Sequence, residues 1–385
     1  MIFSFLSSMR FLRYIICIIV LASGLLTDLR AGVCERTSSP AKLIYDVGFD
    51  MNFDNREYYK SDFSRSMTIF GTRFTPGLGL QVSSENTGIE HDLIVGADVL
   101  KEFGAPEITV TPTCYYRLYK DLGETDMTLY AGIFPRKSME GKYSQAFFSD
   151  SLKFYDNSLE GVLMKFQRPK AYFEVGCDWM GMYGQSRRER FMIFSAGEGD
   201  VAPILDLGYA AYMYHFAGSR EVSGVVDNFL VNPYACFDFS HLTDFQVLVF
   251  KVGWLQAMQN DRRNIGIYTY PSAGELDAEV RKWNFGIRNI FFYGKDMMPY
   301  YNFTDAAGVK YGNSLYLGDP FYRVHDDGAD SAGVYDRLEL FWNPDLGALL
   351  DVYVGAVFHF NDFHYSGTQQ VVKLSFNLHD MINRK

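Results

Sequence analysis

Apolar and polar side chains alternate along most of this chain with a period of two residues. In the segment 43–53 every odd position is apolar, whereas the even positions include Asp46, Asp50 and Asn52. The same alternation returns in three further segments: 70–82, 89–103 and 372–378. Because the side chains of a β-strand point alternately to its two faces, each segment predicts a strand with one apolar and one polar face.

The connections between these segments indicate how the strands are joined. The pattern predicts sixteen strands: 43–53, 69–82, 88–103, 108–120, 125–134, 159–168, 171–181, 190–196, 203–217, 225–239, 245–258, 278–293, 298–304, 334–342, 348–360 and 368–378. Every second connection is short, and several of the others are long, as in membrane barrels with short turns at one end and long loops at the other. The strand at 298–304 has the weakest pattern, so fourteen strands is the alternative.

We therefore expect an all-β fold, a single transmembrane antiparallel β-barrel of about sixteen strands. A soluble β-sandwich also alternates apolar and polar positions. The length of the strands, the charge on their polar faces and the aromatic pairs near strand ends, such as Tyr58–Tyr59 and Tyr300–Tyr301, favour the barrel.

Composition supports this interpretation. The chain holds 33 Phe and 27 Tyr, and Tyr suits positions where one end of the side chain is apolar and the other is wet. Apolar residues make up 48% and charged residues 21%, which excludes a disordered chain and a polytopic helical membrane protein. A net charge of −10 leaves no basic surface for nucleic acid.

The first 32 residues resemble an export signal. Arg10 and Arg13 precede the apolar run 14–26, and small residues allow cleavage after Gly24 or Ala31. An uncleaved N-terminal anchor is the alternative. We expect a signal peptide at 1–32, and a barrel with long outer loops at 33–385, placed in the outer membrane of a Gram-negative bacterium.

The polar faces supply candidates for a lumen that selects solutes. The first half of the chain offers Asp46, Asp50, Asp92, Asp98, Glu102, Glu174 and Asp178, and the second half offers Lys282, Arg288, Arg337 and Lys373. In a closed ring, acidic and basic walls of this kind would face each other across the pore and sort polar solutes. The alternative is an ordinary barrel interior whose charges neutralise each other in salt bridges.

The loops supply a second set of candidates. Six arginines, namely Arg136, Arg187, Arg188, Arg190, Arg262 and Arg263, could bind an anionic solute or the phosphates of lipopolysaccharide. A solvated loop surface is the alternative interpretation.

Evidence for catalysis is weaker. The segment 359–367 holds His359, Asn361, Asp362, His364 and Ser366, which include the Ser, His and Asn of an outer-membrane phospholipase, but not that family's sequence pattern. Asp326, Asp327 and Asp330 lack the spacing of a calcium-binding loop. We expect no catalytic residues, no metal and no cofactor.

Several stretches resemble a family of uncharacterised porin-like outer-membrane proteins of Bacteroidota. They are FDNREYY at 53–59, AGIFPRK at 131–137, AFFSDSLKFYDNSLEG at 146–161, DWMG at 178–181, RRERF at 187–191, VVDN at 225–228 and GWLQ at 253–256. The resemblance spans roughly residues 42–378 and implies export, a barrel fold and an outer-membrane location. It implies no activity and assigns no functional residue.

The function that these features favour is a porin-like pore that passes small polar solutes. The alternatives are an outer-membrane lipid-modifying enzyme and a structural or adhesive barrel that binds surface glycans. The expected partners are the outer membrane, lipopolysaccharide and small polar solutes, with no nucleic acid and with a homo-oligomer as an open question.

Overall fold

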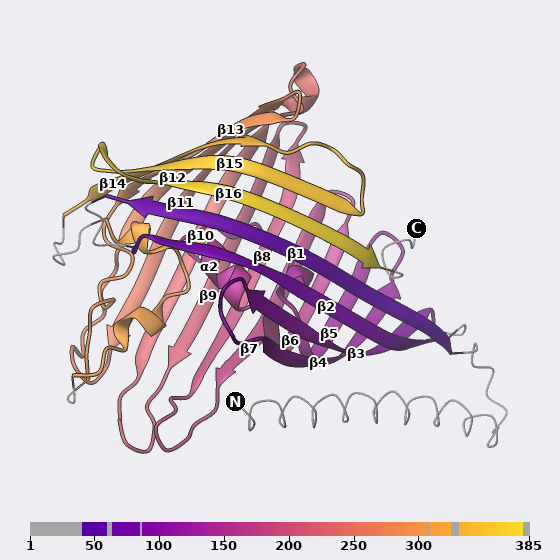
Figure 1. The fold of residues 1–385 in the computed structure, drawn as a ribbon, viewed down its shortest axis with the longest axis horizontal. Helices are drawn as coiled ribbons and strands as arrows, with labels where there is room; N and C mark the ends of the chain where they lie inside the picture. The colour runs from indigo at the N-terminus through magenta and orange to yellow at the C-terminus, as the bar shows by residue number, and fades with distance from the viewer. Residues whose placement is uncertain (1–40, 60–63, 85–86, 306–307, 325–330, 380–385) are drawn as a thin grey trace.

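The protein is a closed barrel of sixteen antiparallel strands (Figure 1). The computed structural model describes residues 41–59, 64–84, 87–305, 308–324 and 331–379. Each strand pairs with its neighbours in sequence, and β1 closes the ring by pairing with β16. This confirms the predicted fold class. The expected signal peptide lies outside the described residues.

About half of the strands are longer than the alternation alone suggested, β1, β2, β8 and β16 most clearly. The first half of the ring contains β1 (Lys42–Tyr58), β2 (Met67–Ser84), β3 (Ile89–Glu102), β4 (Thr109–Asp121), β5 (Asp126–Pro135), β6 (Ser158–Arg168), β7 (Ala171–Gly181) and β8 (Arg190–Ala202). The second half contains β9 (Leu205–Phe216), β10 (Val226–Asp238), β11 (Val247–Asp261), β12 (Ser272–Lys282), β13 (Phe285–Gly294), β14 (Gly333–Trp342), β15 (Leu350–Asn361) and β16 (His364–His379).

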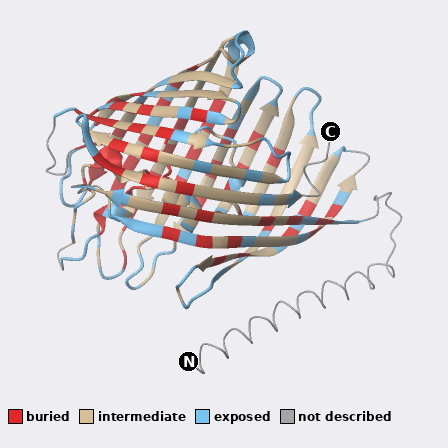
Figure 2. Ribbon diagram, turned by 45° about the horizontal axis from the view of Figure 1, so that its top comes forward, coloured by how far each residue is buried: buried red, intermediate tan, exposed pale blue. Residues whose placement is uncertain are grey.

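The two faces of the wall differ as the alternation predicts. Ile44 on the inner face is fully buried, whereas its neighbour Leu43 on the outer face is 61% exposed. Figure 2 shows buried and more exposed positions alternating in bands along the strands. The outer face is therefore largely apolar, and most of the charged side chains of the strands lie on the inner face.

The strand count of sixteen is correct, but two of the predicted strands were wrong. The segment 278–293 is not one strand, because β12 and β13 meet there in a two-residue turn. Trp283 and Asn284 form this turn with φ of 53° and 67°, a conformation that Asn-Gly usually signals and Trp does not. Residues 298–304 are not a strand either: they belong to a connection with buried side chains, including Tyr300.

The connections divide the barrel into two ends. Both described termini and the seven connections 85–88, 122–125, 169–170, 203–204, 239–246, 283–284 and 343–349 lie at one end, which we call the turn end. The longest connections lie at the other, the loop end. They are L3 (136–157), with η1 (Arg136–Ser138) and α2 (Asp150–Tyr155), and L7 (295–332), with η3 (Gly312–Leu315) and η4 (Pro320–Arg323). A further short helix, η2 (Ser240–Leu242), lies in a turn.

L3 and L7 pack together inside the barrel. Backbone hydrogen bonds join the N–H of Asp319 to the carbonyl of Gln145 (2.8 Å) and the N–H of Ser149 to the carbonyl of Leu317 (2.9 Å). Gly318 lies between these bonds, and a Cβ atom there would stand 2.1 Å from the carbonyl oxygen of Ala146. Only glycine allows the two loops to approach this closely.

Aromatic side chains of both loops form an apolar core with the inner wall of the barrel. Phe147 from L3 and Phe321 and Tyr322 from L7 are fully buried in the same cluster as Phe292 and Tyr335 of the wall. This core fills part of the lumen towards the loop end. In the described ranges, no helix is long and apolar enough to cross a membrane.

Candidate binding cavity in the lumen

The acidic inner wall holds L3 in place, and Glu174 of β7 is its clearest anchor. Its carboxylate accepts hydrogen bonds from the backbone N–H groups of Glu140 (2.6 Å) and Gly141 (3.0 Å) and from the hydroxyl of Tyr143 (2.8 Å). A buried carboxylate with three donors is well satisfied, so Glu174 is a structural clamp.

Four other acids of the same wall also contact L3. Their contacts are Asp46 with Lys137 (3.6 Å), Asp98 with Asn157 (3.4 Å), Glu102 with the hydroxyl of Tyr155 (2.8 Å) and Asp178 with Arg136 (3.4 Å). Arg73 of β2 adds a link, because its guanidinium pairs with Asp98 and donates to the carbonyl of Phe154 at the end of α2. The acidic wall is thus largely used for docking this loop.

On the opposite side, one carboxylate connects the wall to both loops. Glu275 of β12 accepts hydrogen bonds from the hydroxyls of Tyr322 in L7 (2.6 Å) and Ser144 in L3 (2.8 Å). The two loops are therefore fixed to the wall at a single buried group as well as to each other.

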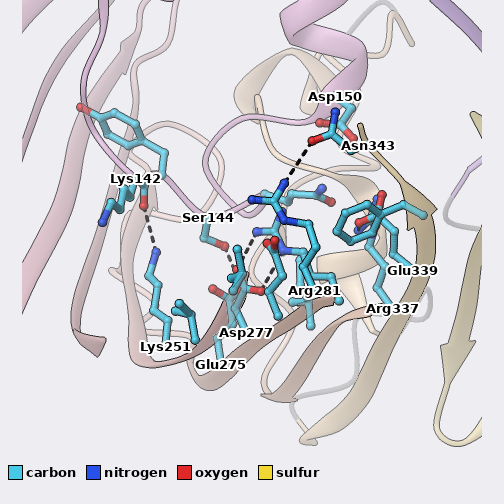
Figure 3. Close-up of a pocket in the computed structure, with 18 of the residues that line it drawn as sticks. Lys142, Ser144, Asp150, Lys251, Glu275, Asp277, Arg281, Arg337, Glu339 and Asn343 are labelled. Carbon is cyan, nitrogen blue, oxygen red and sulfur yellow. Dashed lines mark hydrogen bonds and ion pairs between the residues drawn. The ribbon is translucent and has the colours of Figure 1, made fainter. Parts of the chain in front are cut away.

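Between L3 and strands β10–β16 lies a cavity of about 590 Å³, which we call the central cavity. Figure 3 shows its lining side chains converging from L3 and from the barrel wall. The lining includes seven basic residues, Lys142, Lys153, Lys251, Arg281, Arg288, Arg337 and Lys373, and five acidic residues, Asp150, Glu275, Asp277, Glu279 and Glu339. A cavity with this lining is polar enough to hold water or a charged solute.

Many of these charges are paired with each other. Arg288 binds Asp277 through two hydrogen bonds of 2.9 and 2.6 Å, and Arg337 binds Glu339 at 2.6 Å. Pairs of this kind fix the shape of the lining while cancelling most of their own field.

The helix α2 contributes one charge of each sign. Lys373 of β16 is the main reason why the pKa of Asp150 lies below its usual value, and Lys153 adds to the effect. Burial lowers the pKa of Lys153, and the cations of the facing wall lower it further. Both shifts indicate a positive potential where α2 faces β13–β16.

The central cavity continues around α2. Asp150, Lys153 and Lys373 also line a second cavity of about 310 Å³. That cavity shares Arg73 and Asn157 with a third cavity of about 390 Å³. The three spaces are therefore adjacent and together surround the helix.

Ten of the eleven predicted lumen residues lie on the inner face of the barrel, but Lys282 does not. Its ammonium lies 5.3 Å from the ring centroid of Phe245 and 5.2 Å from that of Trp283, at the turn end. In a strand running through 278–293, Lys282 would share a face with Arg288. The turn at 283–284 reverses this relation, because Lys282 pairs with the exposed Phe285 and Arg281 pairs with Gly286.

The six predicted loop arginines do not form one surface. Arg136 is buried and bonded to Asp178 and Asp156, so its interpretation as a loop-surface ligand was wrong. Arg262 forms an ion pair with Asp227 at 2.6 Å. The remaining arginines lie in three different environments. Arg187 donates to the carbonyl of Met182, and Arg190 donates to the carbonyl of Met180. Arg188 and Arg263 line the same cavity of about 430 Å³ at the loop end.

The residues considered for catalysis are not arranged as a nucleophile and its base. His359 is fully buried, and its two ring nitrogens bond to the hydroxyl of Tyr335 and the amide of Gln369, each at 2.9 Å. The hydroxyl of Ser366 donates to the carbonyl of His364. Within the described ranges no group of three or more His, Cys, Asp or Glu side chains is placed to hold a metal ion, and residues 325–330 lie outside those ranges.

Sequence reasoning missed several lining residues of the central cavity. Glu275, Asp277, Glu279 and Arg281 occupy alternate positions of β12, so a period of two was available to find them. The sequence did not reveal the β12–β13 hairpin, so the inner face of β12 was not predicted. Lys153 carries no such signal, because its place depends on how L3 folds back into the lumen.

Comparisons with known proteins identify a family and a set of similar folds. A family model described as "Lipid A 3'-O-deacylase-type" matches residues 38–376. A search of curated proteins gives no significant match. Similar solved structures include Pseudomonas aeruginosa OpdO, with a TM-score of 0.51, 10% identity and coverage of 88% of this chain and 98% of that one. A structure of P. aeruginosa OccK3 (OpdO) has a TM-score of 0.50, 10% identity and coverage of 88% and 96%. At this identity the likeness concerns the fold.

Proposed function

The chain belongs to the lipid A 3'-O-deacylase-type family. From its barrel fold and its lumen we propose that it is an outer-membrane pore for small polar solutes. The observation that carries the proposal is the set of adjacent charged cavities around α2 inside a closed sixteen-stranded wall. Barrels of this size enclose an aqueous space unless their loops fill it.

The outer surface supports a membrane location. Large apolar side chains face outwards along the wall, among them Leu93 (55% exposed) and Trp254 (51% exposed). At the turn end, Trp283 and Phe285 are exposed close to Lys282, the combination expected at a membrane–water interface. On this proposal residues 1–32 direct export, and the loop end faces the lipopolysaccharide.

The loops determine what size of solute is able to pass. L3 and L7 fill the lumen towards the loop end with apolar side chains, so the remaining path runs past α2 through the central cavity and the two cavities beside it. The adjoining cavities, of about 590, 310 and 390 Å³, suit small solutes and exclude folded chains.

Single-channel recording tests the proposal. Detergent-folded protein in a planar bilayer is expected to produce discrete conductance steps in KCl. Arg73→Ala, which releases the end of α2 from the wall, is expected to increase the step size. A correctly folded, heat-modifiable barrel that never conducts would reject the pore.

A second candidate, lipid A modification, is favoured by the family match alone. An enzyme acting on lipid must present reactive groups to the outer face of the barrel, and His359 points inwards. His215 is on the outer face, where it stacks on Phe191 and is the cross-strand partner of Asp227. Mass spectrometry of lipid A from cells expressing the wild type or His215→Ala checks this candidate. A lost acyl chain that depends on His215 would favour an enzyme over a pore.

A further inference from the structure

Three basic side chains of the central cavity make no direct ion pair. Among the residues that the structure describes, Lys251, Arg281 and Lys373 make no ion pair with a carboxylate. The other basic residues of the lining, by contrast, are engaged by Glu198, Asp150, Asp277 and Glu339.

Each of the three contacts neutral groups that position its charge without cancelling it, and Lys373 in addition acts on Asp150 without a direct ion pair. The ammonium of Lys251 donates to the backbone carbonyl of Lys142 at 2.9 Å and lies 4.1 Å from the ring centroid of Tyr234. Lys373 lies 5.8 Å from the ring centroid of Tyr353. Contacts with carbonyls and aromatic faces leave the positive charge available to a ligand.

Arg281 also contacts a neutral group, and part of its guanidinium makes no hydrogen bond at all. One terminal nitrogen donates to the side-chain carbonyl of Asn343 at 3.2 Å, while its buried Nε has no hydrogen-bond partner. A buried guanidinium donor without a partner is rare, because an unmade hydrogen bond to a charged group is costly. Its place in the lining of the central cavity provides room for an acceptor.

The acids of the lining offer little opposing charge. Asp277 and Glu339 are occupied by Arg288 and Arg337. Glu275 accepts hydrogen bonds from two neutral hydroxyls and makes no ion pair, and Glu279 likewise makes none among the described residues. Three cations without an ion pair against two such acids leave the cavity a net positive charge, which attracts an anion.

We propose that the central cavity is a binding site for a small anionic solute, held by Lys251, Arg281 and Lys373. The proposal rests on the pore function and names the class of solute that the pore takes. Suitable anions carry a carboxylate or a phosphate, because both accept charge-assisted hydrogen bonds from ammonium and guanidinium groups.

The first test is the reversal potential of the open pore in a KCl gradient. The wild type is expected to prefer chloride, and Lys373→Glu to shift the preference towards potassium. Lys282→Glu is the matched control, because it introduces the same change on the outer face and is expected to leave the reversal potential unchanged. A wild-type pore that prefers potassium would overturn the anion site. Equal shifts in the reversal potential of Lys373→Glu and Lys282→Glu would overturn it as well.

The second test measures binding without conduction. Calorimetric titration of the detergent-folded barrel with inorganic phosphate, and separately with succinate, is expected to give a saturable heat of binding. Lys373→Glu is expected to lower the affinity for the anion roughly tenfold, the usual effect of losing one charge-assisted hydrogen bond. Comparing the two anions shows which acid group the site prefers. A silent bilayer with saturable binding would reject the pore and keep the site, whereas conduction without anion binding or anion preference would keep the pore and reject the site.

Discussion

The two charged walls of the barrel differ in what their charges do. On β1–β7, five of the seven predicted acids, Asp46, Asp98, Glu102, Glu174 and Asp178, contact L3. On β11–β16, the basic residues of the inner face line the central cavity, and three of them make no direct ion pair with a described carboxylate. One wall therefore builds the structure inside the lumen, and the other faces the space that remains.

The difference shows that charge on an inner face does not by itself indicate selectivity. A carboxylate surrounded by backbone N–H groups, such as Glu174, has its charge balanced locally and exerts little field in the pore. A lysine against a carbonyl or an aromatic ring keeps its field. We predicted an acidic and a basic wall that face each other across an open pore. The structure instead has a docking wall, β1–β7, which binds L3, and a ligand-facing wall, β11–β16, which lines the central cavity.

The largest expected effect comes from breaking the docking wall at Glu174. Glu174→Gln replaces one acceptor oxygen by an NH₂ group that faces backbone donors, so L3 should lose its clamp at residues 140–141. We expect the free energy of unfolding to fall by about 2–4 kcal/mol, as for other broken buried charge networks. The single-channel conductance should rise because L3 leaves the lumen.

Asp92→Asn is a control that separates the loss of stability from the gain in conductance. Asp92 is buried on the same wall, but its carboxylate contacts Arg117 and Gln81 and not L3. This variant should lose stability in urea unfolding without gaining conductance. Equal conductance gains in both variants would mean that the acidic wall does not act through L3.

The next effect concerns the contact between the two loops. Gly318→Val places side-chain atoms where even a Cβ would lie 2.1 Å from the carbonyl oxygen of Ala146. Overpacking of this kind costs about 1–3 kcal/mol. L3 and L7 should separate and become susceptible to limited proteolysis, while heat-modifiable migration of the barrel is retained. Unchanged protease resistance would show that the loops do not depend on each other.

A smaller effect tests the paired charges of the ligand-facing wall. Arg288→Gln removes one positive charge and Asp277→Asn one negative charge from the same ion pair. The reversal potential should move in opposite directions, each by less than in Lys373→Glu, which changes the charge by two units. The double variant should return close to the wild type. Shifts in the same direction would indicate a change of shape instead of charge.

Much of the barrel could be predicted from the sequence because its wall obeys a local rule. Alternation assigns each side chain to one face of the strand. The inner position of Asp46 and the outer position of Leu43 therefore follow from their immediate neighbours in sequence. The rule failed at Lys282, where a turn formed by Trp283 and Asn284 lacks the glycine that normally reveals a hairpin.

The interior of the lumen could not be predicted in the same way. The inner face of Glu174 was evident, but its ligands belong to a loop more than thirty residues away in sequence. Nothing local indicates that L3 turns inwards, that L7 meets it at Gly318, or that Arg136 is buried. Long-range packing decides which charges remain free, so the central cavity emerged only from the folded chain.

The smallest expected effect is a pH dependence at α2. The pKa of Asp150 is lowered by Lys373 and Lys153, so its carboxylate stabilises the folded loop above its unfolded value of 3.8, and this stabilisation is lost as the pH falls below that value. The side chain is 38% exposed, and solvent screening keeps the contribution modest. Conductance noise of the wild type should therefore increase as the pH falls from about 4 to about 2 and α2 loosens. Asp150→Asn should lack that part of the increase, because its amide does not titrate. Identical pH profiles would assign the loosening to the carboxylates of the docking wall and leave α2 held by Arg73 and Glu102 alone.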